Sequence, residues 1–288
     1  MTKPPTPPDG SGPQDPVQAT ASPVLPGALA PAPMPAMKTI GVLGGMSTAS
    51  TLQYYELLCT LTDARFGGRH GPRLLIQSVD FGAVTHLQNE GAWGALGDML
   101  AREAEALERG GAEMIVLATN TMHKVVPRMM RDVSVPLIHI ADATAERILA
   151  GGFSHPGLIG TQLTMEDRFY LDRLRGLGLQ PVVPEEPDRE RLHEVIYEEL
   201  IRKVAEPESR TAFVSIAGRL KTMGADCLIL GCPEVGLLLD ADNSPLPVFD
   251  TTRIHCEAAL DAALGPAPHF GLGVGVGVGV AASGKDPA

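Results

Sequence analysis

The chain has 288 residues, of which 44% are hydrophobic and 20% charged, a composition typical of a globular protein with a substantial core. The formal net charge of −11 argues against nucleic acid or an anionic membrane as a partner, and no apolar stretch reaches the roughly 20 residues needed to span a bilayer. The four cysteines show no CxxC or CxxH spacing, so the sequence predicts neither a metal site nor a disulfide framework, and it favours reduced thiols in the cytoplasm.

The two ends of the chain differ from its middle. Residues 1–36 are dominated by Pro, Ala, Gly and Ser, and they contain too little apolar surface to offset the entropy of ordering. We therefore expect a disordered tail there, and Met37 is a second candidate for the natural start. Residues 265–288, with a Gly-Val alternation at 271–280, are expected to form another low-complexity tail.

Between the tails, short apolar runs alternate with patterns of helical period. This alternation predicts an α/β fold built on parallel strands that are joined by right-handed crossovers. In chain order, strands are expected at residues 39–43, 74–79, 114–118, 137–140, 156–159, 180–183, 227–230 and 247–249, and helices at 50–61, 93–109, 142–150, 165–177, 189–203, 208–223 and 252–264.

The order of these elements predicts two α/β halves. The first spans residues 37–140 and is completed by a returning segment, 249–264, while the second spans residues 141–248. Functional sites of open α/β sheets lie beyond the carboxyl ends of the strands, so polar motifs at strand ends carry the most weight.

The first such motif is the glycine-rich turn from Gly41 to Ser47, which joins a strand to a helix. Its spacing is not GxGxxG, so it is a poor candidate for binding a dinucleotide. A tight strand–helix connection explains it better, although backbone N–H groups at such a turn can still bind a carboxylate.

The second motif follows the buried strand at 114–118 and contains Thr119, Asn120, Thr121 and His123. Such a cluster of hydroxyl, amide and imidazole groups fits a functional site. Helix capping by Thr or Asn beside a solvated histidine is an equally good interpretation.

The third motif places Cys232 directly after the strand at 227–230, with Pro233 as the first residue of an expected helix. A thiol at the positive end of a helix is expected to have a lowered pKa and to ionise readily. Cys59, Cys227 and Cys256 fall within predicted helices or strands, and core packing explains them better.

Together the second and third motifs resemble those of the aspartate/glutamate racemase family, which carries a Cys-Asn-Thr motif in one half and a Gly-Cys-Thr-Glu motif in the other. The resemblance covers residues 37–264. It rests on segments 38–47, 78–81, 120–124, 139–144, 160–161, 164–166, 196–200 and 248–251.

This resemblance implies two pseudo-symmetric, Rossmann-like halves with the active site in the cleft between them. It implies an amino-acid racemase that needs no cofactor and acts on aspartate, glutamate or a broader set of amino acids. Thr119 and Cys232 would be the two groups that transfer the Cα proton, one on each face of the substrate. Thr119 replaces the family's first catalytic cysteine, as in a subset of racemases, and Pro233 replaces a threonine and leaves fewer polar contacts.

The resemblance also suggests which residues bind the substrate. Donors around Met46, Ser47, Asn120 and Thr121 could stabilise the negative charge that develops on the substrate carboxylate. The remaining candidate contacts with the substrate are Gln88, Pro233 and Arg191, whose guanidinium would suit a distal carboxylate but could equally be a surface ion-pair partner.

Three further residues could support the proton-transfer groups. His123 is a candidate base for the Thr119 hydroxyl, while Glu234 and His255 are candidates for contact with Cys232. For both histidines, a solvated or capping role is an alternative.

Two other functions fit the same residues. A one-cysteine decarboxylase of the superfamily would protonate its intermediate from one face only, and a non-catalytic homologue would only bind an amino acid. In all three cases the expected partner is a small amino acid, and a cytoplasmic homodimer is expected.

Overall fold

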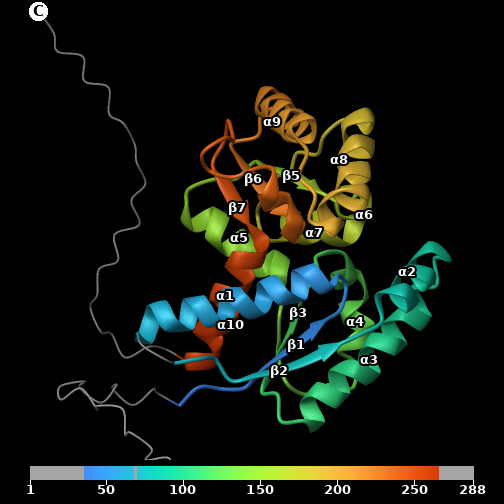
Figure 1. The fold of residues 1–288 in the computed structure, drawn as a ribbon, viewed down its shortest axis with the longest axis vertical. Coiled ribbons are helices and arrows are strands. Elements are labelled where there is room, and N and C mark those ends of the chain that lie inside the picture. Colours follow the sequence, from blue (N-terminus) through green and yellow to red (C-terminus); the bar gives the residue numbers. More distant parts are fainter. Residues whose placement is uncertain (1–35, 68–69, 266–288) are drawn as a thin grey trace, which may run out of the picture. The chain divides into compact units, whose positions relative to one another are not determined.

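The computed structural model describes residues 36–67 and 70–265 (Figure 1). The expectations for tails at residues 1–36 and 265–288 fall almost wholly outside these ranges. The described chain forms two parallel β-sheets covered by helices, which confirms the predicted α/β class.

The first sheet has the strand order β2-β1-β3-β4, and all of its strand pairs are parallel. Its central strands, β1 (Ile40–Gly44) and β3 (Met114–Leu117), are buried along their whole length. Strands covered on both faces are expected to be continuously apolar, which is the pattern that these segments show. The outer strands are β2 (Leu74–Ser78) and the two-residue β4 (Leu137–Ile138).

Helices cover both faces of this sheet. On one face, α1 (Thr48–Phe66) packs beside α10 (Thr251–Leu264), the last helix of the described chain (Figure 1). On the other face, α3 (Trp93–Arg109) packs against apolar side chains of β1 and β3. Successive side chains of a strand point to opposite faces of the sheet. Leu43 therefore packs in the apolar core on the α3 side, and Val42 packs in the core on the α1 side.

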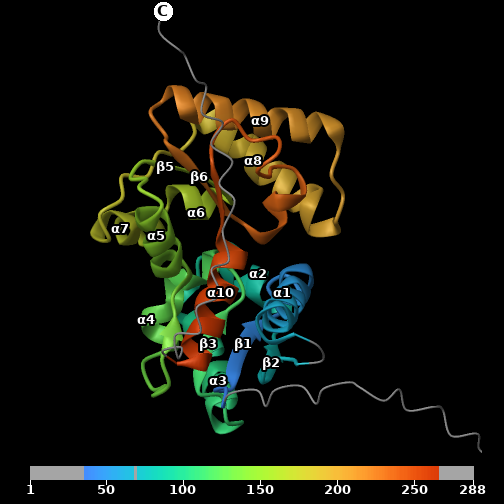
Figure 2. The same cartoon turned by 90° about the vertical axis from the view of Figure 1, so that its left-hand side faces the viewer.

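The second sheet has the order β5-β6-β7, with strands at Pro156–Gly160, Cys227–Gly231 and Val248–Asp250. Around it lie α5 (Ile140–Ala150), α6 (Gln162–Glu166), α7 (Arg168–Gly176), α8 (Glu186–Glu198) and α9 (Pro207–Thr222), of which α8 and α9 lie side by side against β5 (Figure 2).

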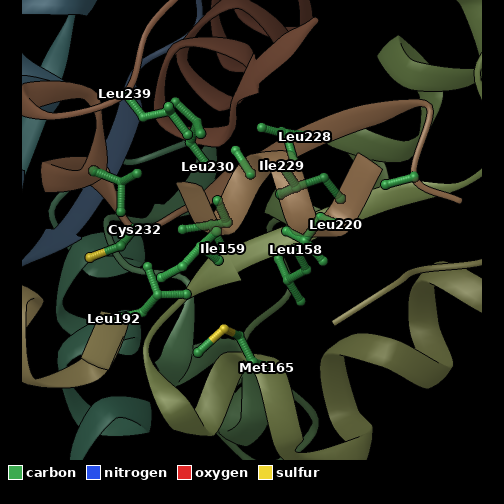
Figure 3. Packing of buried hydrophobic residues seen from close by; sticks show 14 of the residues in the cluster. Leu158, Ile159, Met165, Leu192, Leu220, Leu228, Ile229, Leu230, Cys232 and Leu239 are labelled. Atoms are coloured by element: carbon green, nitrogen blue, oxygen red, sulfur yellow. The ribbon is translucent and has the colours of Figure 1, made fainter. Parts of the chain in front are cut away.

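The core of the second sheet is built largely from leucine and isoleucine (Figure 3). Cys232 lies at one end of this cluster, and its sulfur points away from the labelled leucine and isoleucine side chains. The remaining elements are short and lie near the strand ends: α2 (Phe81–Asn89), α4 (Val126–Met129) and the 3₁₀ helices η1 (Thr121–Val125), η2 (Leu200–Arg202) and η3 (Pro233–Leu237).

The strand predicted at residues 180–183 is wrong. Only Val182 pairs there, through a single parallel bridge to Gly157 at the edge of β5. Pro181 lacks the N–H that a ladder needs, and Pro184 ends the extended stretch two residues later.

Two predicted helices are interrupted. The helix expected at residues 165–177 is divided by Asp167, which is extended and caps α7 with its carboxylate. The helix expected at 189–203 ends at Glu198 and continues only as η2, after which Lys203 adopts a left-handed conformation with φ 61°. The helix α2, which sequence reasoning missed, begins after the capping residue Asp80.

In the part of the chain that the structure describes, no helix has both the length and the apolar character that a membrane crossing requires.

Candidate active site

A pocket lies where the carboxyl ends of strands from both sheets meet. The loop after β1 contributes Met46 and Ser47, the loop after β3 contributes Thr119, and the loop after β6 contributes Cys232. About 500 Å³ of space, part of it open to solvent, lies within this pocket. The other lining residues are Ser50, Phe81, Gln88, Asn120, Thr121, Met122, Thr161, Ile196, Tyr197, Ile201, Gly231, Pro233 and Glu234.

The glycine-rich turn after β1 leaves no room for a side chain at position 45. Gly45 has φ +91°, and a Cβ atom there would lie 2.3 Å from the carbonyl oxygen of Val79. Its N–H donates to the Thr51 hydroxyl at 2.7 Å. The turn therefore delivers Ser47 to the pocket as the N-cap of α1, where its hydroxyl accepts from the N–H of Ser50.

Cys232 and Glu234 form a hydrogen-bonded pair in the pocket. The thiol donates to Oε2 of Glu234 at 2.9 Å, and both side chains are buried. Burial and then the charge of the neighbouring carboxylate hold the pKa of the thiol well above its usual value.

This raised pKa corrects the expectation of an easily ionised thiol. The sequence correctly places Cys232 at a helix start, but the helix is the five-residue 3₁₀ helix η3, with little dipole to offset burial beside a carboxylate. Burial beside the carboxylate therefore disfavours the thiolate, and Glu234 accepts the hydrogen bond of the thiol.

Ser47 joins the glycine-rich turn to this pair. Its hydroxyl donates to Oε1 of Glu234 at 2.9 Å, so the two carboxylate oxygens are hydrogen-bonded to residues that follow different sheets. This arrangement fixes the carboxylate beside the thiol. Pro233, between Cys232 and Glu234, also lines the pocket.

Thr119 follows β3 and lines the same pocket, and no hydrogen bond joins its hydroxyl to another described residue. The next two residues, Asn120 and Thr121, are held by side-chain hydrogen bonds. The Asn120 amide donates to the Thr251 hydroxyl at 3.0 Å and accepts from the Tyr170 hydroxyl at 3.1 Å. The Thr121 hydroxyl lies 3.2 Å from that of Thr161, at the end of β5. The loop that carries Thr119 is thus anchored to the second sheet.

His123 does not contact the Thr119 hydroxyl, contrary to the expectation of a general base. Its Nδ1 lies 2.8 Å from the carbonyl oxygen of Thr119, and its Nε2 accepts from the N–H of Ile140 at 3.3 Å. This pattern requires the proton on Nδ1. Burial and the neighbouring histidines His139 and His255 keep the pKa of His123 well below its usual value. His123 is therefore a neutral group that holds the main chain.

His255 lies away from Cys232, which corrects the expectation of a contact between them. Its Nδ1 is 2.8 Å from the Tyr54 hydroxyl, and its Nε2 is 2.7 Å from the carbonyl oxygen of Ile138. Burial lowers its pKa to about 4. His255 therefore joins α10 to the first sheet as a neutral, fully hydrogen-bonded side chain.

Arg191 also lies outside the pocket. Its guanidinium donates to the Glu194 carboxylate at 2.7 Å and to the Ser209 hydroxyl at 3.4 Å. Gln88, on α2, does line the pocket. Among the described residues, no cluster of three or more His, Cys, Asp or Glu side chains is arranged to hold a metal ion.

Several lining residues were not predicted. Thr161 directly follows β5, so its place at a strand end was a signal that could have found it. Ile196 and Tyr197 lie in a segment already noted for its family resemblance. Phe81 ends the resemblance segment 78–81, and Ile201 falls within the helix expected at 189–203, but neither signal pointed to the pocket.

The sequence matches the family described as Asp/Glu/hydantoin racemase over residues 43–259. The chain belongs to this family. The matched segment contains the loops of the pocket that carry Ser47, Thr119 and Cys232.

This racemase-family chain is similar to its relatives over most of its length. It is 41% identical to a candidate Asp/Glu racemase from Yersinia pestis, whose crystal structure matches with a TM-score of 0.75 over 80% of this chain and 100% of that one. It is 36% identical to an aspartate racemase homologue from Pyrococcus horikoshii, with a TM-score of 0.71 over 79% and 99% of the two chains. It is also 24% identical to the broad-specificity amino-acid racemase RacX of Bacillus subtilis, over 78% of this chain and 98% of RacX.

Proposed function

We propose that this protein is a cofactor-independent amino-acid racemase in which Cys232 and Thr119 transfer the Cα proton on opposite faces of the substrate. The observation that carries the proposal is that both residues line one pocket, with the Cys232 thiol hydrogen-bonded to Glu234. Membership of the racemase family and the named activities of its relatives support the same reaction.

In the proposed mechanism, Glu234 accepts the thiol proton as the sulfur removes the proton from Cα. The electron pair left on Cα is delocalised into the substrate carboxylate. The Thr119 hydroxyl then delivers a proton to the other face, and solvent restores the proton that it loses. In the reverse direction these roles are exchanged.

The negative charge on the substrate carboxylate has to be stabilised by donors of the pocket. Backbone N–H groups of Met46 and Thr121, at the starts of α1 and η1, are the candidates for this role, whereas that of Ser47 donates to the Ser50 hydroxyl. We assign Asn120 to positioning, because both ends of its amide are already hydrogen-bonded within the protein.

Isotope exchange tests the proposal. Incubation with single enantiomers in D₂O should introduce deuterium at Cα and invert the configuration, as followed by NMR and chiral chromatography. Release of carbon dioxide without inversion would show a decarboxylase, and binding without exchange would show a non-catalytic homologue.

We also propose that the protein acts in the cytoplasm as a homodimer. Its four cysteines are all free, as is usual in a reducing compartment. Large apolar side chains, Leu52 and Tyr55 on α1 and Ile76 on the outer strand β2, are exposed and could be covered by a second copy. Light scattering during gel filtration measures the molecular mass, and a monomeric mass would reject the dimer.

A further inference from the structure

Within the described part of the chain, the pocket has no positively charged side chain to receive a distal carboxylate. Among the described residues that line it there is no lysine, arginine or histidine. Its one carboxylate, Glu234, accepts hydrogen bonds from Cys232 and Ser47. A second carboxylate, on a substrate side chain, would therefore enter a pocket that already holds negative charge.

The basic side chains on nearby elements have other partners. Lys124 pairs with Asp167 and lies over the ring of Trp93, 4.1 Å from its centroid. Arg191 donates to Glu194, as described above, and Arg189 donates to Glu166 at 2.8 Å. None of these three cations lines the pocket.

The pocket is instead lined by both polar and apolar side chains. The polar groups follow the strand ends, where the amino acid's own carboxylate and Cα have to be held for the proposed reaction. Phe81 on α2, Ile196 on α8 and Ile201 on η2 supply an apolar wall. Tyr197 on α8 also lines the pocket, and its ring is a further apolar group.

The composition of this lining determines which substrate side chain the pocket can bind well. An apolar side chain gains by leaving water for such a wall. A carboxylate that loses its water without gaining a cation or a set of N–H donors is strongly disfavoured, and the nearby Glu234 repels it further. A long ammonium or guanidinium group would meet the same apolar wall.

We propose that the pocket selects α-amino acids with uncharged, predominantly apolar side chains, such as methionine or leucine, over aspartate and glutamate. This specificity rests on the proposed racemase function. It separates the chain from those relatives whose names contain aspartate or glutamate. Ile201 is the residue at which the specificity should be alterable, since it lines the pocket from the short helix η2 and is not one of the proton-transfer groups.

The first test compares substrates for the wild-type protein. The value of kcat/KM should be at least about tenfold higher for methionine and leucine than for aspartate and glutamate. Equal or faster turnover of aspartate or glutamate overturns the inference, as does a clear preference for lysine or arginine.

Calorimetric binding of the same amino acids makes the result independent of activity. Tighter binding of methionine than of aspartate supports the specificity even if no amino acid is racemised, an outcome that would reject only the proposed function. Tighter binding of aspartate overturns the specificity whatever the activity.

The second test introduces a cation. Ile201→Arg should raise the kcat/KM for glutamate relative to methionine by about tenfold or more, whereas Ile201→Met, similar in length but uncharged, should leave the ratio nearly unchanged. Thermal unfolding shows whether both variants are folded. If Ile201→Arg is folded and the ratio stays as in the wild type, the assignment of Ile201 to the side-chain wall is wrong.

Discussion

The two sides of the pocket differ in the groups that could accept or donate a proton. On one side, Cys232 has a carboxylate 2.9 Å from its sulfur. On the other side, Thr119 has a hydroxyl with no described partner, and its neighbour His123 is bound to the main chain instead. Both groups follow strands of parallel sheets, so a similar place in two similar halves does not bring similar chemistry. That chemistry depends on the residues two to four positions further along.

The largest expected effect comes from removing the thiol. Cys232→Ser should lower Cα exchange by about 10⁴-fold, because a serine hydroxyl ionises far less readily than a thiol even beside Glu234. Deuterium incorporation measured by NMR gives the rate. Cys59→Ser, on α1 and away from the pocket, is the matched control and should retain most of the activity. Substantial exchange in Cys232→Ser would remove the thiol from the mechanism.

Loss of the carboxylate should have the next largest effect. Glu234→Gln should slow exchange by about 10²-fold at neutral pH, because the thiol loses its proton acceptor. The thiol pKa is raised, so the variant must rely on the small ionised fraction of Cys232, which grows as the pH rises. The rate of the variant should therefore climb through the alkaline range, where the wild type has already levelled off.

A control for this variant is Glu198→Gln, which removes an exposed carboxylate of α8 that pairs with Arg202. It should keep both the rate and the pH profile of the wild type. A Glu234→Gln profile parallel to that of the wild type would show that Glu234 does not take the thiol proton.

A smaller effect is expected on the Thr119 side. His123→Asn should lower kcat by about tenfold, because Thr119 loses the ring that holds its carbonyl group. Since the pKa of His123 lies well below its usual value, the wild-type profile should show no histidine ionisation near pH 6, and the variant should keep the same shape. A limb of the profile that disappears in His123→Asn would instead make His123 an acid–base group.

The smallest expected effect is a difference between the two enantiomers in the ratio of deuterium exchange to inversion. Starting from the enantiomer whose Cα proton faces Cys232, deuterium should enter faster than inversion occurs, because the thiol returns a proton before Thr119 delivers one. From the other enantiomer, exchange and inversion should keep pace. Thr119→Cys should bring the two ratios of exchange to inversion closer together, within a few-fold. Equal ratios in the wild type would show that Thr119 is as active as a thiol.

The sequence predicted the fold class and the strand ends at which the pocket lies, because buried parallel strands and polar loops both leave local patterns. Cys232, Thr119 and Ser47 were found in this way, and each lines the pocket. What it could not predict are the properties that depend on distant contacts. The direction of the thiol's pKa shift depends on burial and on the bond to Glu234, and neither can be read from a residue's place at a helix start.

The histidines and Arg191 show the same limit. His123 is four residues from Thr119, which suggested a bond between their side chains, but the ring turns to the carbonyl group and to Ile140. Arg191 has the right chemistry for a carboxylate, yet Glu194, one turn along the same helix, takes its guanidinium. Side-chain partners such as these are decided by tertiary packing, and a single sequence does not encode them locally.

The packing of α10 has a consequence for how the protein is made. The face of the first sheet that carries Ile40 and Val42 is covered partly by Cys256, Ala259 and Leu260 of this last helix. A ribosome releases the strands of that sheet long before it releases the helix. The first sheet is therefore synthesised first, but its core is completed only when α10 has been made. Until then the nascent chain leaves an apolar face of this sheet uncovered while the second sheet is translated. Chaperones that bind such surfaces have their longest opportunity at this face, and a chain that stops before residue 251 should be recognised as incomplete even though all of its strands are present.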